Sequence, residues 1–189
     1  MKALIILMAF ICSSCAIKGN FGGLYSNYNK MQSRNPKLYV TTEVGSSVCD
    51  IERANEPRVF LVTGSDLKKC IKSETPTVVY LWSPRCKSTI CYPLEILQQK
   101  CDALGLALFV VAEYYDNEHM NYNFRIKNPV YGVNTIYYNS NLTSNYLRDF
   151  ISDLSAQREN ENKYLYYNSG KFIGSYKSLD DIKPAIVQQ

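Results

Sequence analysis

Three short apolar runs predict the centre of an α/β domain. Residues 58–62, 77–82 and 106–112 are mainly apolar and rich in β-branched side chains, a pattern typical of strands buried on both faces. Between them, apolar residues at helical spacing predict a helix capped by Ser65 and a longer helix over residues 90–104. This alternation of strands and helices favours parallel pairing, with the helices as crossover connections.

The flanking segments predict a mixed sheet that ends in a hairpin. Residues 37–42 are expected to form an edge strand, and residues 142–154 an amphipathic helix. Apolar residues on both sides of Asn168-Ser169-Gly170 predict an antiparallel hairpin, and Ser178 begins a last helix. Weaker patterns predict a short helix within residues 116–124 and an extended segment over residues 130–138. The predicted fold class is α/β, a central mixed sheet flanked by helices, with a C-terminal β-hairpin and helix.

The N-terminus has the form of a secretory signal peptide. Lys2 precedes an apolar run over residues 3–11, which is too short for a stable transmembrane anchor. The next residues, Cys12-Ser13-Ser14-Cys15, resemble the lipobox of bacterial lipoproteins, although Cys12 stands where that motif prefers Leu. The resemblance implies a signal peptide over residues 1–14 and a lipid anchor, such as palmitate, on Cys15. An ordinary secretory cleavage that leaves a soluble protein is the alternative.

Charge and composition fit one domain at the cell envelope. Residues 15–35 lack hydrophobic periodicity and are interpreted as a tether, and residues 36–189 as a single domain. Removal of residues 1–14 lowers the formal net charge from +4 to +3, and Lys and Arg do not cluster, so a nucleic-acid partner is not expected. No acidic residue lies between Cys15 and Glu43, unlike the acidic tracts of some surface-exported lipoproteins. We therefore expect a lipid-anchored protein that faces the periplasm.

Cys86 is the principal candidate for chemistry. It lies four residues after Trp82, where the strand predicted at 77–82 ends, and the long helix is expected to follow it. Free N–H groups at the start of a helix stabilise a thiolate, which lowers the pKa of a thiol and makes its sulfur more nucleophilic at neutral pH. A reactive cysteine is therefore expected at this position.

In this order, the elements resemble the thioredoxin superfamily over about residues 58–187. They are most similar to its membrane-anchored periplasmic thiol-disulfide oxidoreductases. The resemblance rests on the strand ending at Trp82, on Cys86, on Pro93 to Leu97, on the strand over 106–112 and on the terminal hairpin. It implies a thioredoxin-like fold, no cofactor, and exchange with protein thiols or disulfides of the cell envelope. Cys86 and Cys91 would be the catalytic cysteines, with Cys91 resolving the mixed disulfide. Trp82 and Pro84 would shape the substrate-binding surface.

Two features depart from the family pattern. The family's C-x-x-C is Cys86-Lys87-Ser88-Thr89 here, and the next cysteine is Cys91. Positions five apart in a regular helix point to different sides, so a Cys86–Cys91 disulfide needs an irregular turn, which Pro84 and Pro93 favour. The family also has a cis-proline before the final hairpin, whereas Asn162-Lys163-Tyr164 contains no proline. A non-catalytic thioredoxin-like binding module is therefore the alternative function.

The remaining cysteines and the single histidine have simpler interpretations. Cys70 and Cys101 lie on apolar helix stripes and are expected in the core, because cysteine is often a small buried hydrophobe. Cys49 lies in a loop-like stretch, and its pairing cannot be deduced from sequence. Cys86, Cys91 and His119 are ligand types that suit a soft metal such as copper. The C-x-x-x-C spacing of the superfamily's copper-delivery members is not met, so no metal is expected and His119 is expected at the surface. No phosphate-binding loop or dinucleotide fingerprint occurs.

Overall fold

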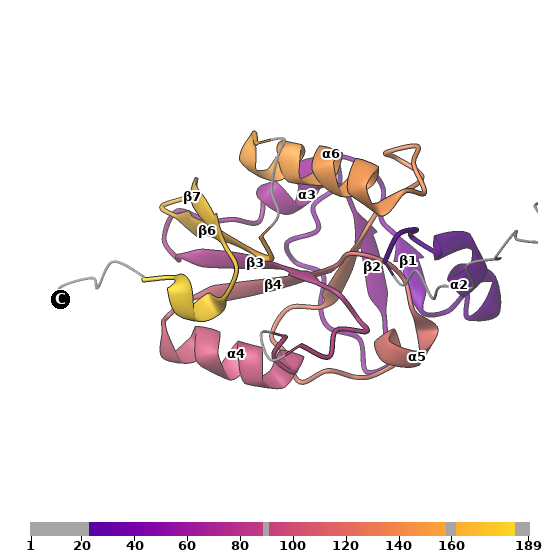
Figure 1. Ribbon diagram of the computed structural model, residues 1–189, viewed down its shortest axis with the longest axis horizontal. Helices are drawn as coiled ribbons and strands as arrows, with labels where there is room; N and C mark the ends of the chain where they lie inside the picture. Colours follow the sequence, from indigo (N-terminus) through magenta and orange to yellow (C-terminus); the bar gives the residue numbers. More distant parts are fainter. Residues whose placement is uncertain (1–22, 89–90, 158–161, 184–189) are drawn as a thin grey trace, which may run out of the picture.

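A seven-stranded mixed sheet organises the domain (Figure 1). The computed structural model describes residues 23–88, 91–157 and 162–183. The sheet order is β1-β2-β5-β4-β3-β6-β7, in which β1 to β5 pair in parallel and β6 and β7 are antiparallel additions at one side. The strands are β1 (Tyr39–Thr41), β2 (Val59–Val62), β3 (Thr77–Trp82), β4 (Ala107–Ala112), β5 (Val130–Val133), β6 (Tyr164–Asn168) and β7 (Lys171–Tyr176). The predicted α/β class with a mixed sheet is confirmed.

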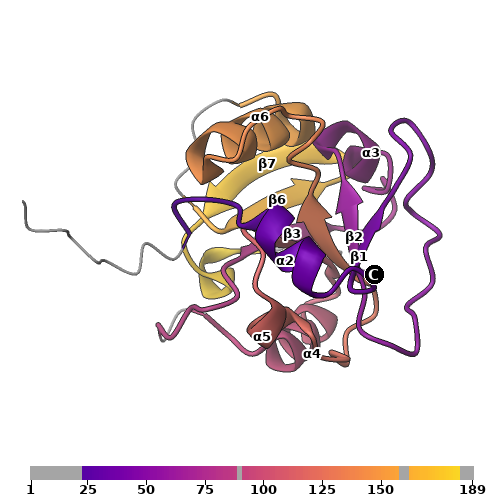
Figure 2. The same cartoon turned by 90° about the vertical axis from the view of Figure 1, so that its right-hand side faces the viewer.

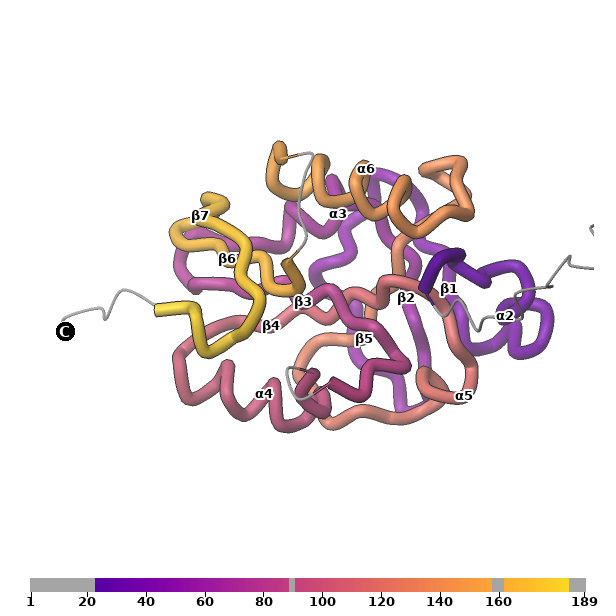
Figure 3. The backbone as a smooth tube through the Cα atoms, viewed as in Figure 1, coloured from indigo at the N-terminus to yellow at the C-terminus, as the bar shows by residue number. Residues whose placement is uncertain are grey.

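Helices cover both faces of this sheet, as Figures 1 and 3 show. The α-helices are α2 (Tyr28–Arg34), α3 (Gly64–Lys68), α4 (Leu94–Ala103), α5 (Asn117–Met120) and α6 (Thr143–Ser155), and Leu179–Asp181 forms one 3₁₀ turn, η1. Alternate side chains of β3 enter opposite cores: Tyr80 packs on the side of α4, and Leu81 on the side of α3 and α6. All six residues of β3 are therefore buried, as its apolar sequence predicts.

Residues 23–35 belong to the folded domain, and the prediction that they form a tether is wrong. Figures 1 and 2 show α2 beside β1. Tyr28, the first residue of α2, packs edge-on against Tyr115, with ring centroids 5.1 Å apart. Ser26 is buried, and its N–H donates to the carbonyl oxygen of Asn141 at 2.9 Å. The segment has no hydrophobic periodicity because single tyrosine and serine side chains, rather than a stripe, hold it on the sheet.

Several element boundaries differ from the predictions for local reasons. Thr63, not Ser65, caps α3, because the Thr63 hydroxyl accepts the Asp66 N–H. The extended segment predicted over residues 130–138 ends at Val133, where the Asn134 side chain accepts the Tyr137 N–H and closes a turn. The last predicted helix is one 3₁₀ turn within the described residues, with Ser178 in a capping box.

Candidate disulfide site after strand β3

Cys86 and Cys91 form a disulfide in the loop that joins β3 to α4. Their Cα atoms are 6.1 Å apart, and both residues are half-buried. The loop is built from short turns: the Cys86 N–H donates to the Ser83 carbonyl, and the Cys91 N–H to that of Ser88, each at 3.0 Å. Of the residues between the two cysteines, the structure describes Lys87 and Ser88, and neither is helical. A Cys86–Cys91 disulfide therefore fits the irregular turn that the five-residue spacing requires.

Helix α4 does not begin at the cysteines. Its first residue is Leu94, with Pro93 as the N-cap, so the expectation that Cys86 opens the long helix is wrong. Pro93 fixes the backbone at the entry to the helix, and Cys91 and Tyr92 before it are not helical. The argument that a helix terminus lowers the pKa of the Cys86 thiol therefore does not apply, and any activation must come from other groups.

Both cysteines lie on the wall of an open cavity of about 380 Å³. Trp82 and Pro84, the two residues predicted to shape a substrate surface, line the same cavity. Phe124 packs edge-on against Trp82, with ring centroids 5.3 Å apart, and the Tyr122 side chain beside it is 60% exposed. Aromatic walls next to a sulfur pair give a surface that can bury apolar side chains of a partner.

Asp116 holds the loop that joins β3 to α4, which we call the disulfide loop, against α5. Its buried carboxylate forms an ion pair with the Arg85 guanidinium and accepts the Glu118 N–H at 2.9 Å, which caps α5. Burial raises the pKa of Asp116, but hydrogen bonds from Arg85 and His119 outweigh burial and lower that pKa below its ordinary value. The carboxylate is therefore charged at neutral pH and ties the loop to α5.

His119 is partly exposed, with 38% of its side chain accessible. It lines the same cavity as Cys86 and Cys91, and its Nδ1 is 3.4 Å from a carboxylate oxygen of Asp116. Ligand atoms of Asp116, Glu118 and His119 lie within 4.8 Å of one another. The carboxylate of Asp116 is already paired with Arg85, so we assign no metal to this group.

A second charged cluster supports the other side of the loop. The Lys163 ammonium contacts Glu113 and donates to the Ser83 hydroxyl at 2.9 Å, and Ser83 also donates to Glu113. The Lys163 carbonyl accepts the Leu81 N–H at 2.8 Å. Lys163 directly precedes β6, and no peptide bond in the described ranges is cis. Sequence reasoning missed Glu113 and Asp116, although both lie within four residues of the end of β4, where loop residues of a parallel sheet gather.

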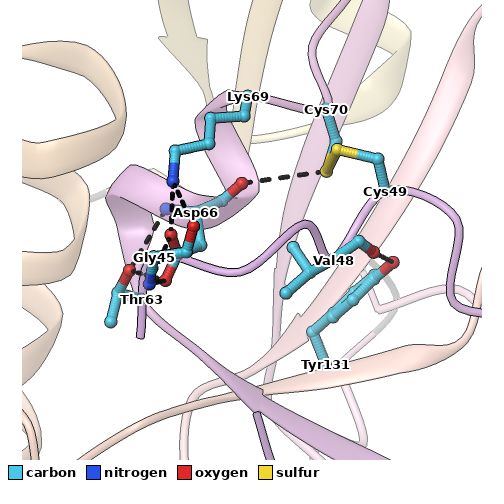
Figure 4. Close-up of a disulfide and its surroundings, with 8 residues drawn as sticks. All are labelled: Gly45, Val48, Cys49, Thr63, Asp66, Lys69, Cys70 and Tyr131. Atoms are coloured by element: carbon cyan, nitrogen blue, oxygen red, sulfur yellow. Dashed lines mark hydrogen bonds and ion pairs between the residues drawn. A yellow bond between two sulfur atoms is a disulfide. The ribbon is translucent and has the colours of Figure 1, made fainter. Parts of the chain in front are cut away.

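The other described cysteines are structural. Cys49 and Cys70 form a second disulfide, with Cα atoms 4.9 Å apart, which joins the long loop after β1 to the residues that follow α3 (Figure 4). Cys70 is buried as predicted, but it is bonded rather than a free core thiol. Cys101 is free and fully buried, which confirms its core prediction, and burial raises the pKa of its thiol to about 12. Cys86 and Cys91 are therefore the described cysteine pair placed on the wall of the open cavity.

No protein-family model, curated protein or solved structure matches this chain. None of the helices in the described ranges has the length and hydropathy needed to cross a bilayer. Cys15 and the predicted signal peptide lie outside those ranges.

Proposed function

We propose that this chain is an envelope lipoprotein whose thioredoxin-like domain exchanges thiols and disulfides through Cys86 and Cys91. The observation that carries the proposal is the half-buried Cys86–Cys91 disulfide on the wall of an aromatic cavity, directly after a central buried strand. A disulfide that a partner thiolate can approach is reactive, whereas a buried one is inert.

The arrangement of elements supports the thioredoxin-like part of the proposal. Strands β3 and β4 pair in parallel with α4 between them in sequence, and the β6–β7 hairpin adds to β3 in antiparallel direction. This is the order of elements on which the family resemblance rests. The lipoprotein part is supported by the sequence at Cys12 to Cys15.

The proposed reaction moves two electrons between the cysteine pair and a partner. In the reduced protein, the Cys86 thiolate attacks a protein disulfide, forms a mixed disulfide and releases one partner thiolate. The Cys91 thiolate then attacks the Cys86 sulfur, releases the second partner thiolate and closes the Cys86–Cys91 disulfide. An external dithiol reduces the pair again, and the same steps in reverse oxidise a partner dithiol.

The test is a trapping experiment with the purified protein and a disulfide-bonded peptide. Cys91→Ser should accumulate a mixed disulfide between Cys86 and the peptide, which mass spectrometry identifies, whereas Cys86→Ser should not. The matched control is the double variant Cys49→Ser with Cys70→Ser, which should retain exchange if it folds. Exchange by Cys86→Ser at the wild-type rate would remove the proposal.

A non-catalytic binding module is the second candidate. The observation that favours it is the ion pair between Lys163 and Glu113. The family resemblance would have a cis-proline just before the final hairpin, where Lys163 stands in this chain. In that case peptides would bind the cavity beside Trp82 with equal affinity before and after Cys86→Ser, and no mixed disulfide would form in Cys91→Ser.

A further inference from the structure

Two uncharged segments meet where the described chain begins. Residues 23–29 and 128–147 contain no Asp, Glu, Lys, Arg or His, although charged residues make up 20% of the sequence. The segments are joined by hydrogen bonds from the Ser26 N–H to the Asn141 carbonyl at 2.9 Å and from the Thr143 N–H to the Leu24 carbonyl at 3.0 Å. A cavity of about 310 Å³ between them is lined only by their residues.

This face exposes large apolar side chains. Leu24 is 44% exposed and Tyr25 50%, and on the loop after β5 Ile136 is 65% exposed and Tyr137 50%. We refer to these four residues as the uncharged face. Single exposed apolar residues are ordinary, but a group of them on segments without charged residues is typical of a site that is covered in use. Tyrosine is also the residue type enriched at the interface between lipid and water.

The position of this face in the chain indicates what covers it. Leu24 is nine residues after Cys15. An extended segment of that length spans at most about 32 Å, and a flexible one about 17 Å on average. A lipid on Cys15 would therefore hold the uncharged face close to the bilayer at high effective concentration, which makes even weak docking effective.

The uncharged segment that begins at Gly23 is also linked to the disulfide loop through Tyr114. A Cβ atom on Gly23 would lie 3.3 Å from the ring of Tyr114, and the hydroxyl of Tyr114 accepts the Arg85 N–H at 3.0 Å. Strands β3, β4 and β5 are parallel, so the loops after β3 and β5, which carry Cys86 and Ile136, leave the same edge of the sheet. A surface that covers the uncharged face therefore lies beside the disulfide.

We propose that the uncharged face docks on the lipid bilayer that holds Cys15, with Ile136 and its neighbours at the depth of the headgroups. This inference rests on the lipid anchor of the proposed function. It limits the partners of the disulfide to thiols and disulfides near the membrane surface. Burial of apolar and tyrosine side chains without desolvating any charge favours such docking.

The test measures contact with lipid at single positions of the full chain. Ile136→Trp and Tyr137→Trp each add a tryptophan on the uncharged face. The matched control is Ile173→Trp, because Ile173 is 54% exposed on β7, at one end of the strand order. The proteins are incorporated into vesicles of phosphatidylethanolamine and phosphatidylglycerol, with and without brominated acyl chains. The emission of Trp82, common to all variants, is subtracted.

Brominated lipid should quench most of the added emission at positions 136 and 137, and little of it at position 173. Equal quenching at all three positions would overturn docking and leave the uncharged face for a protein partner. The mass of the N-terminal peptide reports separately whether Cys15 carries a lipid. Quenching confined to 136 and 137 supports docking when the mass shows a lipid on Cys15, and a mass without that lipid overturns the proposal. Thiol exchange is not measured, so failure of the proposed exchange reaction is distinguishable.

Discussion

The hydroxyl of Tyr114 accepts a hydrogen bond from the backbone N–H of Arg85 at 3.0 Å. This bond fixes the residue next to Cys86, and the Tyr114 ring at the same time packs against Gly23, where the described chain begins. One side chain thus joins the disulfide loop to the first residues of the fold.

Tyr114→Phe should loosen the disulfide loop without emptying the core. Loss of one hydrogen bond costs about 1 kcal/mol, which corresponds to a change of about fivefold in a local opening equilibrium. We expect dithiothreitol to reduce Cys86–Cys91 up to about fivefold faster, measured by alkylation and mass spectrometry. Tyr137→Phe, at a position that is 50% exposed, is the control and should leave the rate unchanged. An unchanged rate in Tyr114→Phe would show that the bond does not restrain the loop.

Gly132→Ala should destabilise the sheet. A Cβ atom at Gly132 would lie 2.8 Å from the ring and hydroxyl of Tyr115, which is fully buried and donates its hydroxyl to the Val133 carbonyl. Overpacking of this kind costs about 1–3 kcal/mol, to be measured as the free energy of unfolding in urea. Gly174→Ala is the matched control, because its Cβ would meet Tyr176 only at 3.6 Å. Equal losses in the two variants would contradict the packing argument.

Asp116→Asn should lower the stability of the protein at neutral pH and reduce the further loss of stability in acid. The folded pKa of Asp116 is depressed, so its contribution is complete above the unfolded value of about 3.9 and is lost as the pH falls through the lower folded value. We expect a deficit of about 2 kcal/mol at about pH 7, because a hydrogen bond to a charged group is lost, and a smaller deficit below about pH 3.

Urea unfolding at the two pH values measures this difference. Asp149→Asn, which removes an exposed carboxylate paired only with its neighbour Arg148, is the control. A deficit for Asp116→Asn that stays constant down to the acid end would contradict the assignment of a depressed pKa.

Removal of the Cys49–Cys70 disulfide should cost more stability than removal of Cys86–Cys91. The first bond closes a loop of 21 residues in sequence and the second a loop of 5. Loop-closure entropy gives about 3 kcal/mol for the longer loop and less for the shorter one. Paired Cys→Ser variants, compared by thermal unfolding, measure both. The reverse order of stability would show that the Cys86–Cys91 disulfide contributes more to the stability of the fold than the Cys49–Cys70 disulfide.

Apolar patterning predicted the strands of the sheet but not the N-terminal segment that packs on it. The runs at 77–82 and 106–112 are mainly apolar and rich in β-branched residues, a pattern typical of central strands. Residues 23–35 were missed because Tyr28 and Ser26 bind through contacts distant in sequence, with Tyr115 and Asn141. Local patterns carry no information about such partners.

The candidate site was predicted in its cysteines but not in its supports. Cys86, Cys91, Trp82 and Pro84 are close in sequence and line one cavity. Asp116 and Lys163 come from loops after β4 and before β6, and only the parallel and antiparallel pairing of those strands with β3 brings them to the loop. The start of α4 was misjudged because Ile90 and Leu94 share helical spacing although Pro93 separates them.

The buried tyrosines limit the highest pH at which the folded protein can exchange thiols and disulfides. Burial raises the pKa of Tyr80 and of Tyr131 to about 12, so the fold requires neutral phenols in its core. Their contribution to stability is complete below the unfolded pKa of about 10 and is lost as the pH rises through the folded values. The rate of thiolate attack also rises with pH, because thiols with a pKa of about 8.5 ionise. At alkaline pH, thiol exchange is therefore expected to become faster until ionisation of the core tyrosines unfolds the protein.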